Sequence, residues 1–172
     1  MNNENMLIDF LGGVDLIKNI IQKIPGNCID YIPNHIDSWT IRQHVIHLVD
    51  SDINNFVRIK SCIAQPYSNI YVIKENEWVK NLDNRKENIN DYLDVFCLLR
   101  KILYNFLKTI SDDDFQNKYF IRDYNNKITN ITLHDAIQNY CDHVMFHKEY
   151  IENIHSEYLK KALNYAVFKY SL

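Results

Sequence analysis

The chain has 172 residues, of which 47% are hydrophobic and 24% charged, with 3 glycines, 3 prolines and a formal net charge of −3. This composition excludes general disorder, and so few Gly and Pro residues disfavour a loop-rich sandwich or barrel and favour helices. A negative net charge also gives no reason to expect nucleic acid as a partner.

The length predicts a single domain over residues 1–172. No secretory signal is visible, and no apolar run approaches the ~18–20 residues needed to cross a bilayer. The cysteines form no Cys-x-x-Cys pair, so we interpret them as small buried side chains: Cys28, Cys62, Cys97 and Cys141. We therefore expect a cytoplasmic protein with no membrane partner.

A first helix is predicted over about 7–24 by the helical spacing of its apolar residues, and Pro25-Gly26 ends it. The pair Gly12-Gly13 weakens this pattern, because each interior Gly costs about 1 kcal/mol relative to Ala. A kink at this pair, or a helix that begins after it, is the alternative to one continuous helix.

A second helix is predicted over about 40–64, beginning at Thr40-Ile-Arg-Gln43, which has the form of a capping box. Its predicted inner face is aliphatic and consists of Ile41, Val45, Val49, Ile53, Phe56, Ile59 and Ile63. Its opposite face is polar but mostly uncharged, and consists of Thr40, His44, His47, Ser51, Asn54 and Arg58.

The second half of the chain contains two further predicted helices. Residues 65–87 lose helical periodicity and are predicted to cover a functional region, because long loops in compact domains usually do. A third helix follows over about 88–110, and residues 117–131 are predicted to form a small β-hairpin around Asn125-Asn126. A fourth helix begins near Thr132, and the tail 156–172 either lengthens it or forms a fifth helix.

Two histidines of the fourth helix, His143 and His147, lie four residues apart. Their side chains would stack on one face, roughly 5–6 Å apart at Cβ, close enough for both imidazoles to bind one metal ion. Because Val144 follows His143, the pair lacks the glutamate of the H-E-x-x-H zinc proteases and brings no general base. The alternative is a pair of core-edge histidines hydrogen-bonded to their neighbours.

A third ligand could come from the second helix, where His44 and His47 are stacked at i,i+3 spacing. Solvated histidines are common on polar faces, so the polar stripe of this helix could simply be exposed. Exposed helix faces are usually rich in Lys and Glu, however, and this one is not. The alternative is a helix buried on both faces, with the stripe lining a wet cleft under residues 65–87.

Several short motifs follow one another in a specific order. They are Ser38-Trp-Thr-Ile-Arg-Gln-His-Val-Ile-His-Leu-Val-Asp-Ser51, then Asn54 and Arg58, Glu75 and Trp78, Thr132-Leu-His-Asp135, and His143-x-x-x-His147. In this order and spacing the chain resembles the DinB family of metal-binding four-helix bundles, most closely its YfiT-like branch, from about Ile24 to Ile154.

The resemblance implies an all-α, DinB-type four-helix bundle with a long covering loop and a C-terminal helical extension. It also implies a divalent metal, most often nickel or zinc, held by three histidines that fall on His47, His143 and His147. Residues that match Ser51, Asn54 and Arg58 line the substrate pocket in relatives. Three neutral imidazoles leave an open coordination position, which is the catalytic pattern for zinc.

This chain departs from the family pattern at three places. His44 stands where relatives generally have an apolar residue, Lys74 replaces an acidic residue before Glu75, and Arg122-Asp-Tyr124 replaces a His-Pro-Glu-like segment. These differences concern the substrate rather than the metal.

The chemistry around such a metal can be assigned only in part. Asp50, Asp142 or backbone carbonyls could accept hydrogen bonds from the second imidazole nitrogens, and Arg58 could bind a carboxylate or phosphate of the substrate. A metal of this kind lowers the pKa of bound water towards ~7 or stabilises a thiolate. The sequence assigns no catalytic base.

Two functional classes fit the resemblance. The first is an enzyme acting on a small molecule: a thiol S-transferase using a low-molecular-weight thiol such as bacillithiol, or a metal-dependent hydrolase. The second is a non-catalytic metal- or ligand-binding stress protein, and a metal-free bundle is the simplest alternative. The apolar surface of the first helix and of the tail predicts a homodimer.

Overall fold

The computed structural model of the chain describes residues 2–35, 38–65, 67, 69–82, 86–122 and 125–170. In chain order the helices and strands are α1 (Asn3–Ile21), α2 (Ile41–Ala64), β1 (Asn69–Tyr71), α3 (Glu75–Asn81), α4 (Ile89–Leu107), β2 (Lys118–Arg122), β3 (Ile128–Thr132) and α5 (Leu133–Tyr170). Two short 3-10 helices, Gly26–Cys28 and Asp112–Gln116, follow α1 and α4.

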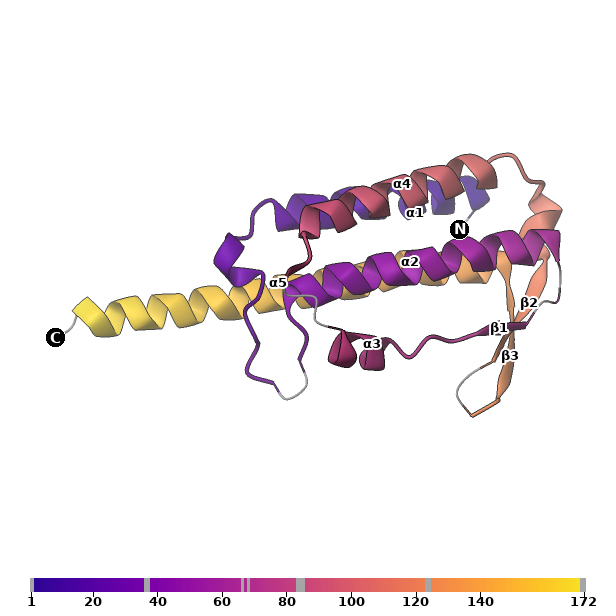
Figure 1. Cartoon of the computed structure of the whole chain (residues 1–172). Coiled ribbons are helices and arrows are strands. Elements are labelled where there is room, and N and C mark those ends of the chain that lie inside the picture. The colour runs from indigo at the N-terminus through magenta and orange to yellow at the C-terminus, as the bar shows by residue number, and fades with distance from the viewer. Residues whose placement is uncertain are drawn as a thin grey trace.

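Four long helices form a bundle, as the sequence predicts (Figure 1). Helices α1 and α2 each contact both α4 and α5, so α1 and α2 occupy opposite corners of the bundle. Helix α5 runs antiparallel alongside α2, and this pairing brings the histidines of the two helices to the same level (Figure 1). None of the helices in the described part of the chain combines the length and apolar character that a membrane span requires.

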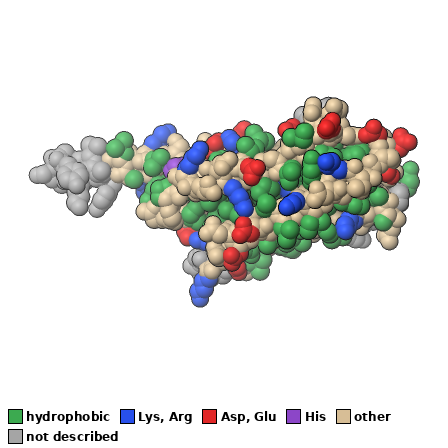
Figure 2. Space-filling view, turned by 90° about the horizontal axis from the view of Figure 1, so that it is seen from above, with side chains coloured by type: hydrophobic (Ala, Val, Ile, Leu, Met, Phe, Trp, Pro, Cys, Tyr) green, Lys and Arg blue, Asp and Glu red, His purple; other side chains and the backbone are tan. Residues whose placement is uncertain are grey.

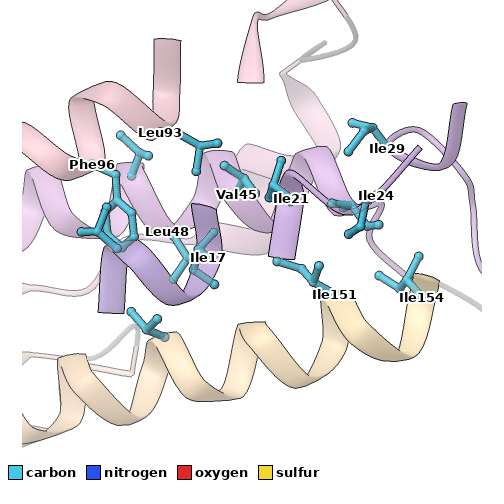
Figure 3. Packing of buried hydrophobic residues seen from close by; sticks show 14 of the residues in the cluster. Ile17, Ile21, Ile24, Ile29, Val45, Leu48, Leu93, Phe96, Ile151 and Ile154 are labelled. Atoms are coloured by element: carbon cyan, nitrogen blue, oxygen red, sulfur yellow. The ribbon is translucent and has the colours of Figure 1, made fainter. Parts of the chain in front are cut away.

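The core consists of aliphatic and aromatic side chains from all four bundle helices. In the half of the bundle drawn in Figure 3, Ile17 of α1 and Leu48 of α2 lie between Phe96 of α4 and Ile151 of α5. A second cluster fills the other half, around Phe10, Leu103 and the strand residue Tyr119. Full burial of such a side chain contributes about 1.5–3 kcal/mol, so these faces determine the helix positions.

The N-terminus of α2 is fixed by the predicted capping box. Thr40 Oγ1 accepts a hydrogen bond from the Gln43 backbone N–H (3.3 Å), and Gln43 Oε1 accepts one from the Thr40 N–H (2.8 Å). Each satisfies a backbone donor that the first helical turn leaves without a partner. The helix start is thus defined, and with it the direction in which His44 and His47 point.

A three-stranded sheet lies at the end of the bundle where α2 ends and α5 begins (Figure 1). The predicted hairpin is confirmed: β2 and β3 are antiparallel, with Phe120 opposite Asn130. Strand β1 pairs with β2 in parallel, and α3 follows it and contacts α2. The segment 65–87, which was not expected to be helical, therefore contains a strand and a short helix. Asp123 and Tyr124 lie outside the described residues.

The tail lengthens the fourth helix, which is one of the two alternatives that the sequence left open. Helix α5 has 38 residues and its C-terminal part projects beyond the other helices (Figure 1). Its side chains become exposed there, as at Leu159 (49%) and Leu163 (65%). Ser171 and Leu172 lie outside the described residues.

Helix α1 is one continuous helix through Gly12-Gly13, so it does not begin after the glycines. One expectation about an individual helix position was wrong. On α2, Ile53 was expected in the core but is 48% exposed, whereas its neighbour Asp52 is 2% exposed. The reason is a buried arginine, Arg100 of α4, which pairs with Asp52 and rotates that side of α2 inward.

Candidate metal centre

Three imidazoles meet where α2 passes α5. His143 Nε2 lies 3.1 Å from His47 Nε2 and 2.9 Å from His147 Nε2. The three possible ligand atoms all lie within 4.8 Å of one another. The i,i+4 spacing on α5 places His143 and His147 on one face, as expected, and the antiparallel packing of α2 adds His47.

The surroundings keep these imidazoles neutral. His47 and His147 are buried, with 6% and 3% of their surface exposed, and His143 is half-buried. Burial lowers the pKa of His47 and of His143 to about 4. The pKa of His147 is lowered to about 2, by burial first and then by the neighbouring His143, His44 and His47. A neutral imidazole has a free lone pair, which is the form that binds a metal.

The donor set fits a divalent cation. Tetrahedral zinc with Zn–N distances of about 2.0–2.1 Å separates its ligand nitrogens by about 3.3 Å. The two Nε2–Nε2 distances that involve His143 are close to this value, and the third pair lies within 4.8 Å. A cation could accept the lone pair of each Nε2, whereas three neutral imidazoles cannot all satisfy one another with the protons they carry. Three imidazoles also leave at least one position open for water or a substrate.

Aromatic side chains surround the three-histidine group. Trp39 lies just before the cap of α2. Its ring stacks on that of His147, with 6.0 Å between the ring centroids, and contacts that of His47, with 5.0 Å between the centroids. Phe146 meets His147 edge-on at 5.3 Å and packs on Tyr150 at 4.7 Å. These rings cover part of the imidazole surface, and electrostatic interactions are stronger where water is displaced.

A cleft of about 700 Å³ opens beside the imidazoles. Its described lining combines the three histidines and His44 with Trp39, Phe146, Tyr150 and Ile154, and with the polar residues His35, Ser38, Glu75, Asn76, Asn153 and Glu157, next to Pro33. That volume lies within the usual range of small-molecule sites, about 300–1,000 Å³. A small molecule in the cleft would therefore lie against the histidines.

Known proteins share this architecture. No protein-family model matches the chain. A Bacillus cereus protein named "Putative metal-dependent hydrolase" is 29% identical over 134 residues, which cover 77% of this chain and 71% of that protein. YfiT from Bacillus subtilis, described as a probable metal-dependent hydrolase with an unusual four-helix bundle topology, superposes with a TM-score of 0.79 at 22% identity, covering 90% of this chain and 87% of YfiT.

The chain has the YfiT-type four-helix-bundle fold of the DinB-like proteins. A DinB-like protein of Bacillus subtilis, YjoA, aligns with a TM-score of 0.59 at 16% identity, over 89% of this chain and 91% of YjoA. The resemblance inferred from the sequence is thereby confirmed.

The predicted pocket residues are not among the described residues that line this cleft. Ser51, Asn54 and Arg58 are half-buried along α2 and are absent from the described lining of the cleft. Asn54 Nδ2 donates to the backbone oxygen of Asp50 (2.7 Å), and Arg58 Nη1 donates to Asn55 Oδ1 (3.2 Å). Their assignment to a substrate pocket stays a prediction.

Of the two predicted acceptors for the imidazoles, Asp50 lines a hollow together with His47, whereas Asp142 is hydrogen-bonded to another residue. Asp142 accepts a hydrogen bond from Gln138 (2.9 Å) on the same helix. Asp50 lines a small hollow together with His47 and Glu75, and burial raises the pKa of its carboxyl to about 6. Glu75, at the start of α3, lines both this hollow and the main cleft, and its charge acts on His143.

His44 is the site residue to which the sequence analysis gave no role. Its Nδ1 lies 2.8 Å from His147 Nδ1, and its side chain is only 5% exposed. Burial, followed by the influence of His47, lowers the pKa of His44 to about 4. Its i,i+3 spacing to His47 was a signal, but nothing in the sequence indicates that it contacts His147, 103 residues away.

Proposed function

We propose that this chain is a metal-dependent enzyme, in which His47, His143 and His147 hold a divalent cation beside the substrate cleft. The observation that carries the proposal is the convergence of three neutral Nε2 atoms at a cleft that is large enough for a small molecule. The names of the similar Bacillus proteins support the hydrolase reading. When bound, the metal would supply a water or thiol nucleophile of lowered pKa.

The chain's own residues supply binding and orientation. Trp39, Phe146 and Tyr150 offer flat apolar surfaces for the non-reacting part of a substrate. Glu75 offers a carboxylate in the same cleft, half-buried and close enough for its charge to act on His143. A carboxylate beside a nucleophile is one of the groups that can accept a proton in hydrolysis, and we assign Glu75 as the candidate base.

A thiol S-transferase is the second candidate, because the cleft volume is also sufficient for a low-molecular-weight thiol beside an electrophile. In both reactions the same three histidines hold the metal, nickel or zinc, and only the nucleophile differs. A non-catalytic metal- or ligand-binding protein would keep the metal without turnover. In either enzyme, Ser51, Asn54 and Arg58 would contact the substrate only if it extends from the cleft along α2.

Metal analysis and turnover assays together test this proposal. The purified protein should contain close to one nickel or zinc per chain, and His47→Ala and His143→Ala should lose it. His155→Ala, on α5 but outside the described cleft lining, is the matched control and should keep it. Ester or amide cleavage that depends on added metal would support the hydrolase, and turnover only with a thiol and an epoxide would support the transferase.

We also propose that the chain forms a homodimer. Large apolar side chains are exposed on α1 and α4: Ile8, Leu16, Val95, Leu98 and Ile102. Figure 2 views the molecule from above and shows hydrophobic side chains spread over these helices. Exposed apolar side chains that gather on one face of a protein can mark an interface. Sedimentation equilibrium of wild type against Leu98→Glu should show a dimer that the charge dissociates.

A further inference from the structure

The rings of His44 and His147 meet through their Nδ1 atoms. The two Nδ1 atoms lie 2.8 Å apart, a hydrogen-bond distance, and both side chains are buried. On the other side of its ring, His147 directs Nε2 towards His143, 2.9 Å away. His147 therefore links the three-histidine group on one side to His44 on the other.

The number of protons fixes the direction of this hydrogen bond. A neutral imidazole carries one N–H, and the nitrogen that offers a lone pair to a metal carries none. If His147 binds through Nε2, its proton is on Nδ1 and is donated to His44. His44 Nδ1 must then be the acceptor, so His44 carries its own proton on Nε2.

We propose that His44 is a positioning residue that accepts the Nδ1–H of His147, and so orients His147 with its Nε2 lone pair towards the metal. This inference rests on the proposed metal site. Metal-binding histidines almost always donate their second N–H to a carboxylate, a backbone carbonyl or water, and these partners tune metal affinity. Here a buried imidazole has that role.

The surroundings of His44 hold its ring in the required orientation. His44 lies in the first turn of α2, where the capping box fixes the backbone, and its N–H donates to the Thr40 carbonyl (3.1 Å). Its ring contacts those of Trp39 (centroids 5.3 Å apart) and Tyr150 (5.5 Å apart). These contacts and the burial of the side chain restrict rotation of the His44 ring away from His147.

The same geometry argues against His44 as a fourth metal ligand. The atoms that converge are those of His47, His143 and His147. The Nδ1 of His44 faces the opposite side of the His147 ring from that convergence point. His44 also lines the cleft.

Metal affinity of three variants tests the proposal. In His44→Asn the amide oxygen takes the place of the Nδ1 acceptor, whereas His44→Ala removes the acceptor and His155→Ala is the control. Zn²⁺ affinity, measured by competition with a chromophoric chelator, should fall about 10–100-fold in His44→Ala and recover largely in His44→Asn. Equal affinity in His44→Ala and wild type would overturn the positioning role.

Spectroscopy separates positioning from ligation. The visible spectrum of the Co²⁺-loaded protein should keep its wild-type intensity in His44→Ala, and a shift to a lower ligand number would show that His44 binds the metal itself. In the Zn²⁺-loaded protein, ¹⁵N NMR should find protons on His147 Nδ1 and His44 Nε2. A proton on His44 Nδ1 would contradict the proposal.

Failure of the metal site and failure of this inference give different results. A wild-type protein that binds no Zn²⁺ or Co²⁺ would overturn the proposed function together with this inference. Wild type that binds metal, with unchanged affinity in His44→Ala, overturns the positioning role alone. Circular dichroism of each metal-free variant establishes that the bundle is folded, so that a loss of affinity reflects the site.

Discussion

Arg100 of α4 and Asp52 of α2 form an ion pair inside the bundle, with 2.6 Å between Arg100 Nε and Asp52 Oδ2 and with side-chain exposures of 1% and 2%. The same guanidinium donates to the carbonyl oxygens of Phe10 (2.8 Å) and Tyr140 (3.2 Å). Phe10 belongs to α1 and Tyr140 to α5, so one side chain connects all four helices. Tyr140 is three residues before His143, so this network lies about one helical turn from the candidate metal centre.

Removal of the Asp52 carboxylate should destabilise the protein strongly. In Asp52→Ala the arginine keeps its charge in the core without a counter-ion, and breaking a buried pair in this way costs about 3–5 kcal/mol. The exposed pair of Lys18 and Asp94 (3.0 Å) is the control, because Asp94→Ala should cost about 0–1 kcal/mol. Urea unfolding measures both, and a loss below 1 kcal/mol in Asp52→Ala would contradict this account.

The two adjacent glycines of α1 should respond oppositely to alanine. A Cβ at Gly13 would lie 2.8 Å from Arg100 Nη1, whereas a Cβ at Gly12 would meet nothing within 4 Å. Arginine ends are usually flexible, but this one is held by its hydrogen bonds to Asp52 and Phe10. Gly12→Ala should therefore stabilise the helix by up to about 1 kcal/mol.

In contrast, Gly13→Ala should destabilise the protein by about 1–3 kcal/mol, as overpacking of a core does. Thermal unfolding of the two single variants gives the comparison, with the double variant as a test of additivity. Equal shifts in both would show that the guanidinium yields, and that the helix tolerates either alanine.

Local sequence signals predicted the start of α2, the hairpin and the fold. Thr40 and Gln43 are three residues apart, so their capping box needs no information from elsewhere in the chain. The resemblance likewise depended on short motifs. The position of Arg100 could not be predicted in this way, because arginine is normally exposed and its partners here come from three other helices.

The errors follow from that arginine and from other long-range contacts. Ile53 was placed in the core by periodicity, but Asp52 needs the interior position to meet Arg100. Strand β1 has few residues and depends on β2, about 50 positions later, for its hydrogen bonds. The hydrogen bond between His44 and His147 is of the same kind, because only the packing of α2 on α5 brings the two rings together.

The metal-free protein should lose stability as the pH falls from about 6.5 towards 4. Burial lowers the pKa of His44, His47 and His143 to about 4 in the folded state, while the unfolded chain binds these protons near pH 6.5. The unfolded state therefore holds more protons in this window, and each such imidazole removes up to about 1.4 kcal/mol per pH unit. Above pH 6.5 this contribution to stability is complete.

Asp50 acts in the opposite direction, since burial raises its pKa to about 6 and its folded form takes up a proton first. One carboxyl offsets the effect of only one imidazole, so the free energy of unfolding should still decrease as the pH falls. Urea unfolding of chelator-treated protein between pH 4.5 and 7.5 measures the slope. His143→Asn should reduce it and His155→Asn should leave it unchanged; a flat profile in wild type would show that the imidazoles are not shielded from water.

The cysteines should be unreactive in the folded protein, apart from Cys97. Burial raises the pKa of the Cys62 thiol and of the Cys141 thiol to about 11, and it also raises that of Cys28. Because the thiolate is the reactive form, an aromatic disulfide reagent at pH 8 should modify only the half-buried Cys97. In guanidinium chloride all 4 cysteines should react.

Cys97→Ser provides the control and should abolish the reaction of the folded protein. The result bears on mechanism, because none of the four cysteines is in the described lining of the cleft. The nucleophile proposed to form at the three histidines would be independent of the protein's thiols, so modification of Cys97 should leave turnover unchanged. Loss of turnover after modification, in wild type but not in Cys97→Ser, would instead point to a protein thiol that takes part in the reaction.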